Sequence, residues 1–129
     1  MQKYIFATVG RSIHALDQAT GTIIWEAPVH SGRIQVSAHA DRLYVVSGDN
    51  KLLVFKAQDG VLLAQTPLTG RGQTPTILID EEQVFVTSGG VLQSFDLDGK
   101  LLWTNEFKGK GNGLMSMATK SKDRQGDEF

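Results

Sequence analysis

The chain contains no cysteine among its 129 residues. This absence excludes disulfides, thiolate metal ligands and cysteine nucleophiles. An excess of one charge is missing as well, because 13 lysines and arginines face 14 aspartates and glutamates, for a formal net charge of -1. A nearly neutral chain has no overall attraction to nucleic acid or to an anionic membrane. We therefore expect no nucleic-acid partner.

Long apolar runs are also missing. No segment is long enough to span a bilayer, and residues 1–10 lack the apolar core and cleavage site of a secretory signal. We expect no membrane span. The chain as written is predicted to be cytoplasmic, and an exported protein is the alternative if the chain is a truncated form of a longer one.

A third absence is helical periodicity. Short runs rich in Val, Ile, Leu, Tyr and Phe, bounded by Gly, Asp and Asn, predict an all-β fold. The expected strands recur in four sets: 4–8, 43–47 and 84–88; 13–16, 52–55 and 92–95; 22–27, 61–66 and 100–107; 35–39, 76–79 and 114–118.

One stretch, from Ala15 to Trp25, returns twice in degraded form. The glycines of the three copies, Gly21, Gly60 and Gly99, are spaced 39 residues apart. A period of about 40 residues with four short strands per unit is typical of a β-propeller blade. The sequence thus predicts a propeller of four-stranded antiparallel blades, three per chain.

The repeated stretch resembles the motif of the pyrroloquinoline-quinone-like (PQQ-like) propellers, Ala-x-Asp-x-x-x-Gly-x-x-x-Trp. The first copy matches it fully and the others in part; the matching residues are Ala15, Asp17, Thr20, Gly21 and Trp25, then Gly60, then Asp96, Gly99 and Trp103. The resemblance implies that each tryptophan lies between neighbouring blades, over a glycine peptide. It makes Trp25 and Trp103 structural docking residues and Ala64, at the second tryptophan position, a weaker junction.

The phase of the repeats shows at which strand of a blade the given sequence starts and ends. Residues 1–119 hold the three repeats, starting on the second strand of a blade and ending on the first, and 120–129 form a polar tail predicted to be disordered. Propellers usually have four to eight blades, and exposed sheet edges favour association. We expect a homodimer that closes six blades. The alternatives are a fragment and one half of a hetero-propeller.

A second repeated pattern, Gly-Arg/Lys-x-Gln/Asn, precedes the last set of strands. Its cations and amides are Arg33 with Gln35, Arg71 with Gln73, and Lys110 with Asn112. Arginine or lysine beside an amide suits carboxylate or phosphate recognition, so these side chains are candidates for an anion-binding channel mouth. The alternative is solvated loops whose residues serve turn geometry.

Catalysis is not expected. His14, His30 and His39 lack metal-ligand spacing, and the acidic residues lie mainly in hairpin turns. By resemblance, quinoprotein dehydrogenases need a calcium site, a catalytic aspartate and often paired cysteines. We predict no cofactor, no metal and a non-catalytic scaffold for a protein or peptide partner. A sensor of a small anionic ligand and a remnant of a quinoprotein enzyme are the alternatives.

Overall fold

The computed structural model describes residues 3–29, 34–70, 75–109, 117–119 and 123–124. These residues form antiparallel strands and turns, and none of them is helical. The first sheet is β1 (Tyr4–Val9), β2 (Ser12–Asp17) and β3 (Ile23–Pro28). The second is β4 (Gln35–His39), β5 (Arg42–Val46), β6 (Lys51–Lys56) and β7 (Leu62–Pro67). The third is β8 (Thr76–Asp80), β9 (Gln83–Ser88), β10 (Val91–Asp96) and β11 (Leu101–Asn105).

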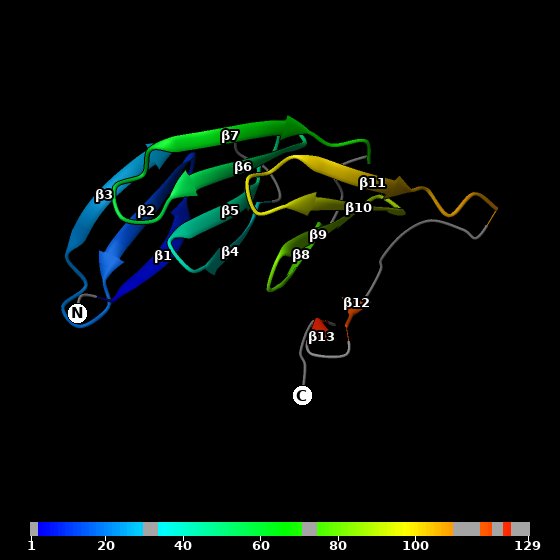
Figure 1. Ribbon diagram of the computed structural model, residues 1–129. Coiled ribbons are helices and arrows are strands. Elements are labelled where there is room, and N and C mark those ends of the chain that lie inside the picture. The colour runs from blue at the N-terminus through cyan, green and yellow to red at the C-terminus, as the bar shows by residue number, and fades with distance from the viewer. Residues whose placement is uncertain (1–2, 30–33, 71–74, 110–116, 120–122, 125–129) are drawn as a thin grey trace.

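The three sheets lie side by side like the blades of a fan (Figure 1). Strands β3, β7 and β11 run along one side, and β1, β4 and β8 lie on the opposite side, where β4 and β8 contact each other. The all-β prediction and the blade-like sheets are confirmed. The last expected strand was 114–118, and its residues 114–116 lie outside the described part. Its other two residues form β12 (Met117–Ala118). This strand pairs with β13 (Asp123–Arg124), which lies in the predicted tail.

Apolar residues between the sheets form the core. One cluster, including Ile13, Leu43 and Phe55, fills the space between the first and second sheets, which we call junction 1. Another, including Val54 and Phe95, fills the space between the second and third sheets, junction 2. Burial on both faces of the second sheet agrees with strands that read as continuous apolar runs rather than alternating ones.

The turn that follows β2, β6 or β10 is built in the same way in each of the three sheets. Gly21, Gly60 and Gly99 have φ values of 77°, 79° and 86°, which an L side chain adopts only at a cost. A β-bulge lies at the same place in each sheet, between Ala15 and Leu16 in the first. Bulges re-aim the side chains beside them, and this one is next to the strand position paired with Trp25.

Junction 1 is held by the indole of Trp25. Its Nε1–H donates to the carbonyl oxygen of Ala57 at 2.8 Å, and its ring stacks on Phe55 with centroids 6.5 Å apart. The ring also covers Gly60 so closely that a Cβ at that position would lie 2.6 Å from Trp25 Cε3. Position 60 therefore requires glycine for two reasons, the positive φ and the contact with the indole.

Alanine at the two turn glycines separates these reasons. Gly60→Ala and Gly21→Ala carry the same backbone penalty, about 1–2 kcal/mol, because both φ values are positive. Nothing lies within 4 Å of a Cβ at Gly21, whereas the one at Gly60 meets the indole. We expect Gly60→Ala to lower the free energy of unfolding of the single chain by a further ~1–3 kcal/mol, in urea titrations at a protein concentration low enough to exclude association. Equal losses for the two variants would show that the indole contact adds no constraint.

Candidate functional site

Each sheet carries a row of three paired residues on the face that looks toward the following sheet, which we call the trailing face. The rows are Phe6, Ala15 and Trp25; Tyr44, Val54 and Ala64; Phe85, Ser94 and Trp103. Phe6 contacts Trp25 and Phe85 contacts Trp103, with centroids 6.0 and 6.2 Å apart. In the second sheet, Ala64 leaves the row without an indole.

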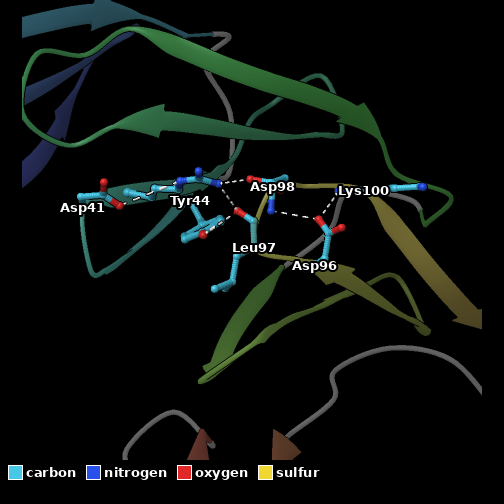
Figure 2. Close-up of polar contacts among 7 residues, drawn as sticks. Asp41, Tyr44, Asp96, Leu97, Asp98 and Lys100 are labelled. Carbon is cyan, nitrogen blue, oxygen red and sulfur yellow. Dashed lines mark hydrogen bonds and ion pairs between the residues drawn. The ribbon is translucent and has the colours of Figure 1, made fainter.

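Polar groups from β5 replace the missing indole at junction 2 (Figure 2). The Tyr44 hydroxyl and Arg42 Nη1 both donate to the carbonyl oxygen of Leu97 at 2.8 Å. Arg42 Nη1 also bonds Asp98 Oδ1 at 2.5 Å. Leu97 lies in the same turn as Gly99, as Ala57 does beside Gly60, so an equivalent carbonyl accepts at both junctions.

A second hydrogen bond ties β7 to this turn, because Thr66 Oγ1 donates to the carbonyl oxygen of Gly99 at 2.6 Å. Position 99 is again sterically limited, since a Cβ there would lie 3.0 Å from Val54 Cγ2. The sequence pattern did not single out Arg42 or Tyr44 as site residues. The available signal was that a hydroxylated aromatic replaces phenylalanine in the one row that lacks tryptophan.

Burial and charge act together at this junction. Burial raises the pKa of the Tyr44 phenol, and the nearby Arg42 opposes that shift. The hydrogen bond that Arg42 donates to Asp98 raises the pKa of the Arg42 guanidinium, so this group stays charged. Tyr44 is therefore a neutral donor and Arg42 a charged one, and both point at the same carbonyl.

A groove of about 820 Å³ opens beside junction 1. Its apolar walls come from the end of β3 and from β6 and β7, and its rim is polar; the lining includes Ala27, Val29, Leu53, Phe55, Leu62, Gln65, Arg11, Asp49 and Lys51. Lys51 Nζ lies 3.5 Å from Asp49 Oδ2. Arg11 has no acidic partner among the residues the structure describes, which leaves one uncompensated cation at the rim.

The proposed channel mouth falls mostly outside the described residues. This applies to Arg33, Arg71, Gln73, Lys110 and Asn112, and only Gln35 is described, exposed at the start of β4.

One glycine of that pattern has a packing role. A Cβ at Gly70 would lie 2.0 Å from the carbonyl oxygen of Ser88 in the third sheet. Asn50 Nδ2 also bonds the carbonyl oxygens of Leu68 and Gly70, at 3.0 and 2.5 Å. Close contact between sheets thus explains this glycine without a ligand.

The aspartates of the repeated motif accept hydrogen bonds from backbone N–H groups of the turns in which they lie. Asp17 Oδ1 accepts from the Ala19 N–H, and Asp96 Oδ1 accepts from the N–H groups of Asp98 and Lys100. Within the described ranges, no three His, Asp or Glu side chains gather as metal ligands would. Nor does that part of the chain include a helix long and apolar enough to cross a membrane.

Tyrosine 44 gives junction 2 a measurable pH dependence. Tyr44→Phe removes the bond to Leu97 and should lower the free energy of unfolding by about 1 kcal/mol at neutral pH. Above pH ~10 the unfolded phenol loses its proton before the buried one, so the stability that the wild type draws from Tyr44 falls as pH rises through the raised pKa. In urea titrations, the difference between the free energies of unfolding of wild type and Tyr44→Phe should be smaller at alkaline pH than at neutral pH. Tyr4→Phe is the control, and a constant gap for Tyr44→Phe would contradict the assignment.

Comparison with known proteins supports the same architecture. The family model described as outer membrane protein assembly factor BamB matches residues 9–128. Among solved structures, BamB from Moraxella catarrhalis is 20% identical with a TM-score of 0.68, and the match covers 85% of this chain and 36% of that one. Apo AztD from Citrobacter koseri is 18% identical with a TM-score of 0.67, covering 83% of this chain and 32% of its own.

Quinoprotein enzymes share the fold as well. The quinohemoprotein alcohol dehydrogenase ADHIIG from Pseudomonas putida HK5 is 18% identical with a TM-score of 0.63, and the match covers 81% of this chain and 19% of that one. No curated protein matches the chain significantly. The chain spans about a third of the BamB and AztD structures. Because the family model covers nearly all of it, the chain belongs to the PQQ-like propeller family represented by the outer membrane protein assembly factor BamB.

Proposed function

We propose that the chain is a non-catalytic scaffold that binds an extended peptide segment of a partner protein in the groove beside junction 1. The groove itself is the main observation, because it combines apolar walls with Arg11 at the rim, a cation that has no acidic partner among the described residues. Strand β3 pairs only with β2 in the described part of the chain, so its other edge is available to an added strand. Strand addition to an exposed edge, with side chains in neighbouring pockets, is a common mode of peptide recognition.

The chemistry of the groove specifies the peptide. Leu53, Phe55 and Leu62 offer apolar contact, and Arg11 at the rim favours a carboxylate. A segment that alternates aliphatic and acidic residues presents both groups, because alternate side chains of a strand point to opposite faces.

Two further observations support a scaffold over an enzyme. The motif aspartates bond backbone N–H groups of their own turns, and His14 Nε2 lies 3.4 Å from Glu26 Oε1 on the sheet surface. The family includes an assembly factor by name, and the quinoprotein dehydrogenases share the fold at 15–18% identity. An anion-binding mouth remains a second hypothesis that rests on the sequence pattern.

We further propose that two copies of the chain associate and close a ring of six blades. The support is apolar exposure on the outward face of the first sheet, where Ile5, Val9 and Ile23 are 54%, 66% and 54% exposed. Apolar patches on a sheet face mark interaction surfaces. In sedimentation equilibrium the expected mass is twice the 14.1 kDa of one chain. A single species of one chain's mass at high concentration would refute this pairing.

Peptide binding is tested with a short labelled peptide that alternates leucine and glutamate, compared with one that alternates leucine and lysine. Wild type should prefer the acidic peptide, and Arg11→Glu should reverse the preference. Leu62→Ser should weaken binding about tenfold through lost apolar contact.

Leu101→Ser is the matched control for Leu62→Ser. Leu101 occupies the same repeat position on β11 and is 42% exposed, against 44% for Leu62, but it does not line the groove. Equal losses for the two serine variants, or no preference between the peptides, would contradict the groove as the binding site.

A further inference from the structure

The first sheet has an outward surface that corresponds to a buried one in the other sheets. We call the face directed toward the preceding sheet the leading face. By strand register, Ile5 of the first sheet corresponds to Leu43 of the second and Val84 of the third. Leu43 and Val84 are 0% exposed because a sheet covers them, whereas Ile5 is 54% exposed. The leading face of the first sheet is therefore equivalent to a junction surface, and no other sheet of the described residues covers it.

The third sheet has an uncovered surface at the other end of the array, on its trailing face. Its trailing face carries Trp103, which packs on Phe85 as Trp25 packs on Phe6, but Trp103 is 43% exposed. No turn glycine lies under its indole among the described contacts. At the other end of the array, Gly21 has an open surface, with nothing within 4 Å of a Cβ. One end thus presents an indole without a glycine, and the other a glycine without an indole.

We propose that Trp103 of one copy lies over Gly21 of a second copy and donates its Nε1–H to the carbonyl oxygen of Gln18. The template is junction 1, where Trp25 lies over Gly60 and donates to Ala57. Gln18 corresponds to Ala57, since each donates its own N–H to the carbonyl oxygen of the residue before β1 or β5, Lys3 and Asp41 respectively. The inference rests on the proposed pairing of two chains and assigns the contact that holds them.

A buried polar atom on the same leading face supports this contact. His14 Nδ1 has no hydrogen-bond partner in the part of the chain that is described. Its register equivalent in the third sheet, Gln93, accepts the Thr69 N–H across junction 2 at 2.9 Å. Lys108 follows Trp103 at the spacing at which Thr69 follows Ala64, so the Lys108 N–H of the second copy is the matching donor to His14.

The contact is head to tail, and a twofold axis makes it occur twice. Each copy gives the trailing face of its third sheet and receives on the leading face of its first. Two identical contacts of this kind close a ring, and no end face then remains open. A second copy of this chain fits both ends, because the two faces continue the junctions already present within it.

Substitution of Trp103 tests the contact. Trp103→Ala should raise the dissociation constant of the dimer at least ~30-fold, as expected for a central aromatic of an interface. Trp103→Phe keeps the ring and loses the N–H donor, so a smaller loss is expected. Leu63→Ala is the matched control, since Leu63 is 45% exposed on β7, away from both end faces. Sedimentation gives the constants, and urea titrations verify that each variant is folded.

Mixing variants tests the direction of the contact. Ile5→Asp damages only the leading face and Trp103→Ala only the trailing face, so each variant alone should be monomeric at a concentration well below its raised dissociation constant. An equimolar mixture restores one intact contact per pair and should associate measurably. Failure of the mixture to associate would overturn the head-to-tail arrangement.

The possible failures are distinguishable. A wild-type dimer that survives Trp103→Ala unchanged would overturn the assigned contact and leave the pairing intact. A monomeric wild type would overturn both the pairing and the contact, and the end faces would then belong to another occupant. Peptide binding in the groove is measured separately on the Trp103→Ala protein, because no groove residue lies on the third sheet.

Discussion

The structure depends on one contact, a large side chain from one sheet that closes on the turn of the next. At junction 1, Trp25 covers Gly60 and bonds Ala57, and the core residues of both sheets pack beneath it. Stacked sheets of this size cannot bury both faces alone, so each depends on its neighbour for stability. The turn glycine matters because any side chain would separate the indole from the peptide below it.

Junction 2 achieves the same closure with different chemistry. Alanine occupies the indole position, and Tyr44 and Arg42 bond the equivalent turn carbonyl from a neighbouring strand. A buried carbonyl without a donor would cost more than the bond itself contributes, which explains why two donors converge there. The repeat therefore preserves the hydrogen-bonded carbonyl and the packed glycine while the residue that supplies the donor changes.

Function is proposed at the places where this repetition is interrupted. The groove beside junction 1 is a space between neighbouring sheets with a cation at its rim. The two end faces are equivalent to junction surfaces but are not covered by any sheet of the described residues, and their exposed residues are the counterparts of buried ones elsewhere. A scaffold built from repeats can thus bind a peptide along its side and another sheet at its ends, using surfaces that the fold already produces.

The amino-acid pattern alone determined the all-β class, the blade period and the strand positions, because short apolar runs, turn glycines and repeat spacing are local properties. It also identified the motif around Trp25. Only the tertiary structure revealed that Arg42 and Tyr44 replace the missing indole. Both residues lie on β5, and the carbonyl that they bond belongs to Leu97, in a turn of the next sheet. The groove and the uncovered Trp103 face likewise depend on which surfaces neighbouring sheets cover, and no local sequence signal encodes that coverage.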